Sequence, residues 1–154
     1  MNAFFKTFAT ATAAATLAMA TPASAQLTLY EDYEPAEEVV EITMVKVDEG
    51  QFETYLEGLK STWIAANDVS KELGYITDYG IYSVPYGEGE WNMMLVTVYP
   101  SSEMLAPNKE RYMKFLETYG KANIDAGNQT VLELYNKIRT IQGTYMLSEV
   151  KMLK

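Results

Sequence analysis

Residues 74–100 read GYITDYGIYSVPYGEGEWNMMLVTVYP, and this stretch decides the fold. Its two halves, 75–86 and 90–99, are rich in the aromatic and β-branched residues that strands favour. Gly87 and Gly89 lie between the halves and can adopt the positive φ angles that a tight hairpin connection requires. The pattern predicts an antiparallel pair of strands that ends before Pro100.

Apolar side chains occupy both faces of this predicted hairpin. Side chains alternate along a strand, yet Tyr79 and Ile81 at one parity are matched by Tyr82 and Val84 at the other. The second strand has the same property, with apolar residues at both parities: Trp91, Met93 and Leu95 against Met94, Val96 and Val98. Because antiparallel sheets usually have one polar face, a sheet that is apolar on both needs a second cover. A second copy of the chain is the simplest cover, so we expect a homodimer.

A strand and a long helix precede the hairpin. Residues 38–47 are rich in β-branched residues and partly alternate, which is typical of a strand. Residues 48–51 have the form of a capping box, and apolar residues then recur at helical spacing from Phe52 to Leu73. Gly74 would close this amphipathic helix at its C-terminus.

A second helical region and a last strand follow the hairpin. Two apolar stripes begin after Ser101 or Ser102, and the segment 120–129 between them contains Gly120, Gly127 and Asn128, which favour a break or kink. After Gly143 the sequence alternates again, as in a strand. The resulting order β-α-β-β-α-β predicts an α+β, ferredoxin-like fold: one four-stranded antiparallel sheet with the helices on one face.

The N-terminus has the features of an export signal. Residues 1–25 contain a cation, Lys6, an apolar Ala/Thr-rich stretch and the small-residue sequence Ala23-Ser24-Ala25. We therefore expect cleavage after Ala25, a periplasmic or secreted protein that begins at Gln26, and no membrane insertion after cleavage. Residues 26–37 carry several carboxylates around Pro35 and are expected to be an exposed acidic leader to a single domain, 38–154.

Composition excludes several kinds of chemistry. The chain has no cysteine and no histidine, which removes disulfides, thiolate or imidazole metal sites and triads that contain histidine. Of 12 Lys and Arg residues Lys6 falls in the signal, so 11 cations face 21 carboxylates in the remainder, a net charge of −10. Such a charge repels nucleic acid. No metal or other cofactor and no nucleic-acid partner are expected.

Three segments carry a resemblance to a known superfamily. VKVDEGQFETYLEGLKSTW (45–63), GYITDYGIYSVP (74–85) and WNMMLVTVYPSS (91–102) resemble the dimeric α+β barrel proteins, in particular the NIPSNAP-like and antibiotic-biosynthesis-monooxygenase-like groups. The resemblance extends over residues 38–152 and is one of pattern, with matches at Gly50, Trp63, Gly74, Tyr82 and Tyr99. It implies a barrel formed by two subunits, often with a pocket between sheet and helices.

The resemblance implies no single activity. The superfamily includes cofactor-independent oxygenases, haem-degrading enzymes, dismutase-like enzymes and proteins without a known activity. Haem-degrading members resemble one another in an asparagine on the first strand and a histidine on the second helix. This first strand reads Ile42-Thr43-Met44 and the chain lacks histidine, so haem degradation is not expected.

Six residues are the candidates for contact with a ligand: Trp63, Tyr79, Tyr82, Trp91, Asn92 and Met94. Trp91 would stack on a ligand while the amide of Asn92 orients a carbonyl. Tyr79 and Tyr82 fall on opposite faces, so only one of them can line a given cavity. Trp63 belongs to the apolar stripe of the first helix, and the flexible thioether of Met94 suits an adaptable lining. Each large side chain also has a structural interpretation, as core or interface packing.

Three hypotheses about function remain open at this point. The first is an exported dimer that binds a small apolar or aromatic molecule. The second is a cofactor-independent, oxygenase-type enzyme, for which Asp78 and Glu90 beside the hairpin are the acids to test. The third is a structural or interaction protein whose aromatic residues only build the dimer. The catalytic residues and the substrate are not identified by the sequence.

Overall fold

The computed structural model describes residues 26–87 and 89–153. The signal peptide predicted for residues 1–25 lies outside the described residues and stays a prediction. The elements follow one another in this order: β1 (Tyr33–Val47), α1 (Phe52–Leu59), a π-helical turn η1 (Lys60–Ile64), α2 (Ala65–Glu72), β2 (Asp78–Ser83), β3 (Met93–Tyr99), a 3-10 helix η2 (Ser102–Leu105), α3 (Lys109–Tyr119), α4 (Lys121–Thr130), a second π-helical turn η3 (Val131–Tyr135), α5 (Asn136–Ile138) and β4 (Arg139–Met152).

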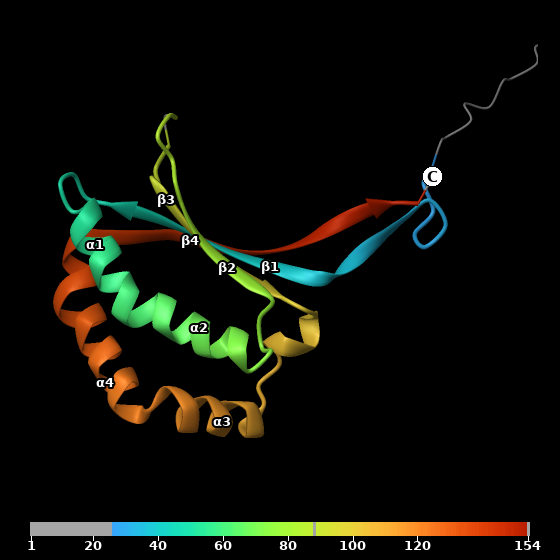
Figure 1. Cartoon of the computed structure of the whole chain (residues 1–154). Coiled ribbons are helices and arrows are strands. Elements are labelled where there is room, and N and C mark those ends of the chain that lie inside the picture. Colours follow the sequence, from blue (N-terminus) through green and yellow to red (C-terminus); the bar gives the residue numbers. More distant parts are fainter. Residues whose placement is uncertain (1–25, 88, 154) are drawn as a thin grey trace, which may run out of the picture.

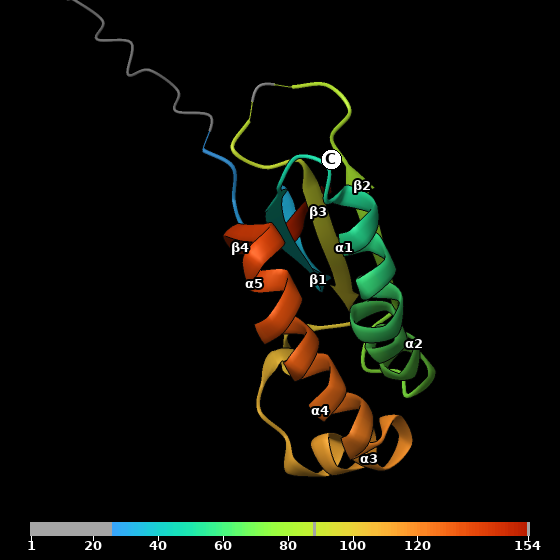
Figure 2. The same cartoon turned by 90° about the vertical axis from the view of Figure 1, so that its left-hand side faces the viewer.

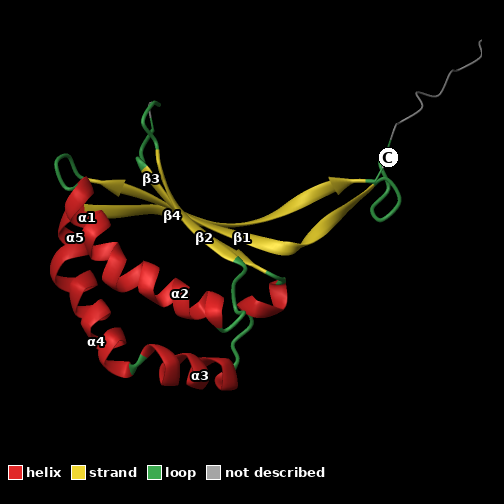
Figure 3. Ribbon diagram, viewed as in Figure 1, coloured by secondary structure: helices red, strands yellow, loops and turns green. Residues whose placement is uncertain are grey.

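The four strands form one antiparallel sheet in the order β2-β3-β1-β4. All the helices cover one face of this sheet and leave the other open (Figures 1 and 3). Seen from the side, α1 and α2 run beside the segment from α4 to α5, with the sheet behind both (Figure 2). The α+β, ferredoxin-like fold predicted from the sequence is therefore confirmed.

The core lies between the sheet and the helices. Its buried side chains come from β1, β3 and both helical layers: Val45, Val47, Tyr55, Leu59, Met93, Leu95, Tyr135 and Ile138. Register explains the match between strands, because Val45 pairs with Met93 and so both point to the helices. The helical segments are held mainly by this apolar face, as expected for short helices in water.

The first helical segment begins differently from the prediction. Gln51 is the N-cap of α1, and no side chain caps it; the backbone N–H of Gln51 instead donates to the carbonyl of Asp48 at 3.1 Å. The expected capping box is therefore wrong, because the chain turns at Gly50, whose φ of 75° suits glycine. At the other end Gly74 has a φ of 72° after α2, which confirms the predicted glycine terminus.

The second helical region is broken at one of the three residues that favoured a break. Gly120, with a φ of 88°, separates α3 from α4. Gly127 and Asn128 lie within α4 and do not interrupt it. The helical region begins with η2 at Ser102, as predicted. Asn108 caps α3, since its side-chain oxygen accepts from the backbone N–H of Arg111 at 2.9 Å.

Strand boundaries depart from the alternation seen in the sequence. The hairpin connection spans 84–92, so Trp91 lies in this loop and not at the start of a strand. Pro85 has no N–H to extend the ladder beyond Val84. At the other edge, β4 starts at Arg139 instead of after Gly143, and β1 starts inside the expected leader, because the two strands pair from Tyr33–Met152 to Val47–Arg139.

The open face of the sheet is mainly apolar, with the charged Asp78 at the β2 edge. Three rows of paired residues cross it: Tyr82-Met94-Met44-Gly143, Gly80-Val96-Ile42-Tyr145 and Asp78-Val98-Val40-Leu147. Each edge strand carries a Gly-x-Tyr sequence whose tyrosine ring lies over its own glycine, since a Cβ on Gly80 would stand 3.0 Å from the ring of Tyr82 and one on Gly143 2.9 Å from the ring of Tyr145. Both rings remain about half exposed.

Candidate functional site

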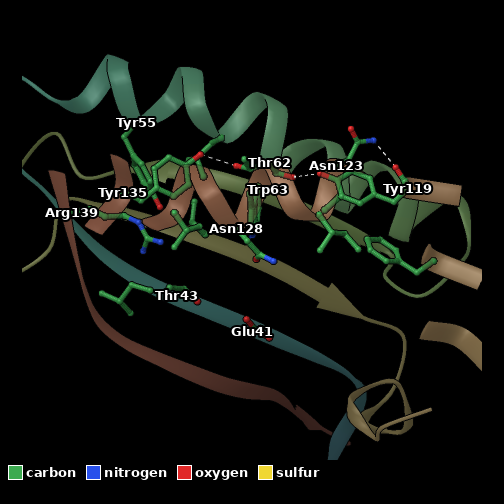
Figure 4. Close-up of a pocket in the computed structure, with 18 residues that line it drawn as sticks. Glu41, Thr43, Tyr55, Thr62, Trp63, Tyr119, Asn123, Asn128, Tyr135 and Arg139 are labelled. Carbon is green, nitrogen blue, oxygen red and sulfur yellow. Dashed lines mark hydrogen bonds between the residues drawn. The ribbon is translucent and has the colours of Figure 1, made fainter. Parts of the chain in front are cut away.

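A cavity of about 520 Å³ lies between the sheet and the two helical layers (Figure 4). Its floor comes from β1, β3 and β4, and its walls come from α1, η1 and α2 on one side and from α3, α4 and η3 on the other. Exposed side chains of Asn123, Asn128 and Ile141 mark its open side, beside the edge strand β4. This size falls in the range of small-molecule sites.

Two π-helical turns meet at the cavity. The hydroxyl groups of Thr62 in η1 and Tyr135 in η3 are hydrogen bonded at 2.7 Å (Figure 4). The two helical layers come this close because residue 58 is glycine: a Cβ on Gly58 would lie 2.7 Å from the ring of Tyr135. Tyr119 of α3 adds a weaker link, since its hydroxyl donates to the carbonyl of Thr62 at 3.4 Å. π-helical turns are rare and often occur at functional sites.

Aromatic rings line much of the wall. Tyr55 and Tyr135 meet edge to face with ring centroids 4.9 Å apart, and Phe115 stacks on Tyr119 at 5.2 Å. Trp63 faces the cavity and also contacts Tyr79 of β2 edge to face, at 5.3 Å. Such contacts fix the rings in place, so the wall is preformed.

Arg139 supplies a positive charge to one end of the cavity. Its guanidinium lies over the rings of Tyr55 and Tyr135, 5.3 and 5.2 Å from their centroids. The Nε atom is buried and makes no hydrogen bond to any residue that the structure describes. Among residues 26–87 and 89–153 no salt bridge to this side chain is present.

Glu41 supplies a negative charge to the floor of the cavity. It lies on β1 six residues before Val47, the residue that pairs with Arg139, which corresponds to about 20 Å along the strand. The hydroxyl of Tyr99 donates to its carboxylate at 3.2 Å. Burial, with the neighbouring charge of Glu41 and this hydrogen bond, raises the pKa of Tyr99 to about 12.

Tyr55 and Tyr135 have raised pKa values and are neutral at physiological pH. Burial raises the pKa of Tyr55 to about 12, although the nearby Arg139 acts in the opposite direction. Burial also raises the pKa of Tyr135, against the effects of the Thr62 hydrogen bond and of Arg139. These groups can donate or accept hydrogen bonds, but neither phenol is poised to act as a base near pH 7.

The structure brings few of the predicted site residues together. Trp63 lines the cavity, and Tyr79 lies behind it on the same face of the sheet. The hydroxyl of Tyr79 donates to Asp68 at 2.5 Å, and this hydrogen bond, with a smaller effect of burial, raises the pKa of Tyr79 to about 12. Tyr79 therefore supports the ring of Trp63 from outside the cavity.

Asn92 and Trp91 lie at the hairpin loop, away from the cavity lining. The side-chain oxygen of Asn92 accepts from the backbone N–H of Val47 and its NH₂ group donates to the carbonyl of Val47, both at 2.8 Å. The amide thus extends the sheet and is already paired, which argues against the expected contact with a ligand carbonyl. Trp91 is half-buried in the loop before β3.

Tyr82 and Met94 lie on the open face, where they are neighbours across β2 and β3. Asp78 and Glu90, the candidate acids of the enzyme hypothesis, also lie outside the cavity lining. Asp78 forms a salt bridge with Lys71 at 2.8 Å, and this hydrogen bond lowers its pKa; Glu90 is exposed in the hairpin loop. The predicted site residues are thus divided between two faces of the sheet.

Sequence analysis missed several residues that do line the cavity: Glu41, Tyr55, Thr62, Tyr119, Tyr135 and Arg139. Tyr55 and Tyr135 lie on apolar helical stripes, and such a stripe does not distinguish a cavity wall from a packed core. A signal existed for Arg139, because alternation from Arg139 to Ile141 places both on one face once β4 is extended to its true start.

The described residues contain no candidate metal site and no candidate membrane-spanning helix. No group of three or more acidic side chains is placed to hold a metal ion within 26–87 and 89–153. Over the same residues, no helix combines the length and the apolar character that crossing a membrane requires.

Comparison with known proteins shows that the chain is similar in fold to several solved structures. No protein-family model and no curated protein matches the chain. Among solved structures, a protein from Shewanella oneidensis is similar over 78% of this chain and 99% of its own, with 14% identity and a TM-score of 0.46. A dimeric protein of unknown function and ferredoxin-like fold from Bacteroides fragilis is similar over 75% and 97%, with 15% identity and a TM-score of 0.42. A dimeric ferredoxin-like protein from an uncultured marine organism is similar over 76% and 89%, with 14% identity and a TM-score of 0.41.

Proposed function

We propose that this protein binds a small apolar or aromatic molecule in the cavity between its sheet and its helices. The observation that carries this proposal is the cavity itself: about 520 Å³ of space lined by fixed aromatic rings and open along β4. A packed core of the same composition would fill this volume, since protein interiors have few voids larger than a water molecule.

Binding is favoured over catalysis by the state of the polar groups. Burial holds the pKa of Tyr55 near 12 and raises that of Tyr135, so both act as neutral hydrogen-bonding groups at pH 7. Histidine, the usual acid–base residue near neutral pH, is absent from the chain. The cavity offers shape, aromatic surface and two separated charges, which are the properties of a binding site.

Fluorescence of Trp63 would test the proposal. In a Trp91→Phe background Trp63 is the one remaining tryptophan of the chain, and titration with the neutral aromatic 2-naphthamide should quench it to saturation. Ala66→Leu, which adds volume to a cavity-lining residue, should weaken binding by about tenfold or more, in line with overpacking penalties of about 1–3 kcal/mol. Ala65→Leu, in the preceding position of the same helix, is the control. Quenching that never saturates would contradict the proposal.

We further propose that the protein is a homodimer that buries the open face of the sheet. Nine residues of this face are apolar or aromatic and at least partly exposed in one chain: Val40, Ile42, Met44, Tyr82, Met94, Val96, Val98, Tyr145 and Leu147. An apolar surface of this extent marks an interaction site. The same face on a second copy is self-complementary, as twofold symmetry requires. The dimeric α+β barrel superfamily that the sequence resembles assembles in this way.

Export remains a proposal that rests on residues 1–25. The intact mass of protein recovered from a periplasmic or culture fraction should correspond to a chain that begins at Gln26. Recovery there of protein that still carries Met1 would refute it.

A further inference from the structure

We propose that the ligand of the cavity carries a carboxylate, which Arg139 binds at the end of the cavity near Tyr55 and Tyr135. This inference rests on the proposed binding function and names the class of ligand: an organic acid with an apolar or aromatic body.

The side chain of Arg139 has a buried hydrogen-bond donor that the described residues leave unsatisfied. Within the described part of the chain its buried Nε makes no hydrogen bond, and buried polar groups in proteins are nearly always paired. No salt bridge to this guanidinium is present among residues 26–87 and 89–153, whereas the lysines Lys60, Lys71 and Lys114 each pair with a carboxylate on the surface. An unpaired cation in a partly buried apolar site is costly, so an anionic partner is indicated.

The aromatic neighbours do not supply that partner. Tyr55 and Tyr135 stand with their centroids 5.3 and 5.2 Å from the guanidinium carbon, an arrangement in which the rings attract the cation without forming hydrogen bonds. The five N–H groups of an arginine lie in the guanidinium plane, and two neighbouring ones can donate to the two oxygens of a carboxylate. The phenols themselves are neutral at pH 7 and add no negative charge.

The other charge of the cavity is too far away to neutralise Arg139. Glu41 lies about 20 Å along β1 from the position that pairs with Arg139, and an arginine side chain spans much less. The cavity therefore has a cation beside Tyr55 and Tyr135 and a carboxylate farther along β1, on the floor opposite Trp63 (Figure 4). An acid with its carboxylate toward Arg139 places its body against Trp63 and keeps its own charge away from Glu41.

A pair of isosteric probes tests the proposal. 2-Naphthoate and 2-naphthamide have the same aromatic body and differ in charge, so the purified protein should bind the naphthoate about tenfold or more tightly, as expected for a charge-assisted hydrogen bond. Arg139→Met should abolish this preference and leave the affinity for the naphthamide within about twofold. Lys137→Met, which removes the same charge from an exposed position on α5, should leave the preference intact.

The outcomes separate this inference from the proposed function. If neither probe binds, the binding function itself fails. If both probes bind wild type equally, or if Arg139→Met retains the preference for the naphthoate, the cavity binds ligands but Arg139 is not its anion site. Should Arg139→Met not fold, as judged by circular dichroism, the comparison of the two probes on wild type still decides, because equal affinities would overturn the proposal.

Discussion

At the scale of single residues, the shape of the cavity depends on one glycine in the first helical layer. Gly58 lies opposite the ring of Tyr135, and any side chain there would meet the ring at 2.7 Å. The contact brings η1 and η3 together and allows the hydrogen bond between Thr62 and Tyr135. Glycine is otherwise unfavourable inside a helix, so its place in α1 is explained by this close approach.

Replacement of this glycine gives the first test. Gly58→Ala should lower the free energy of unfolding by up to about 2 kcal/mol, because overpacking costs about 1–3 kcal/mol and the gain in helix propensity offsets about 1 kcal/mol. Urea unfolding followed by circular dichroism measures the change. Gly127→Ala is the matched control: a Cβ there would meet Thr62 at an ordinary 3.8 Å, so this variant should be as stable as wild type or more stable. A stabilised Gly58→Ala would contradict the packing described here.

At the scale of elements, the second helical layer is divided so that it can close the cavity. The chain changes direction at Gly120, which places Tyr119 of α3 and Asn123 of α4 at the same wall. The side-chain NH₂ of Asn123 donates to the carbonyl of Tyr119 at 2.5 Å and satisfies a group that the break leaves free. The break between α3 and α4 thus places side chains from both helices in one wall of the cavity.

The conformation at this break can be tested directly. Gly120 has φ 88° and ψ 134°, a region that other residues avoid, so Gly120→Ala should cost about 1–3 kcal/mol although a Cβ there would meet Asn123 at an ordinary 3.8 Å. Denaturant unfolding measures the loss. Gly127→Ala, which adds the same methyl group inside α4 where φ is helical, should not lower stability. Equal changes in the free energy of unfolding for both substitutions would show that a side chain at residue 120 causes no backbone strain.

At the scale of the whole molecule, one chain leaves too much apolar surface in water. Besides the open face, the far ends of β1 and β4 extend beyond the helices as a two-stranded ribbon (Figure 1). Val150 and Met152 on this ribbon are each 59% exposed. A two-stranded ribbon is marginally stable by itself, so the extension is consistent with a second subunit that covers it.

Light scattering tests the dimer. The purified protein should have twice the mass of one chain at micromolar concentration. Ile42→Lys, in the centre of the open face, should give monomers or shift the dissociation constant by at least about a hundredfold, because two buried cations would face a closed apolar interface. Leu132→Lys makes the same exchange at an exposed position in η3 and should remain dimeric. A monodisperse wild-type monomer would refute the assembly.

The sequence by itself determined the order of elements and the two-sided apolar character of the sheet. Both depend on local properties: the glycines at 74 and 120 end helices through their own backbone conformations, and the alternation of Met93 to Val98 assigns residues to faces without reference to the rest of the chain. The ferredoxin-like fold follows from that order because few topologies accommodate it.

The tertiary structure alone decided where the cavity lies and which residues line it. Arg139 and Tyr55 are 84 positions apart, and no periodicity in the sequence shows that a guanidinium lies over that ring. Asn92 was a candidate for ligand contact, yet the register places its amide against the backbone of Val47. Local patterns assign each side chain to one face of its own strand or helix. The shape of the cavity depends instead on the distance between the packed elements, and Gly58 sets how closely the two helical layers approach each other.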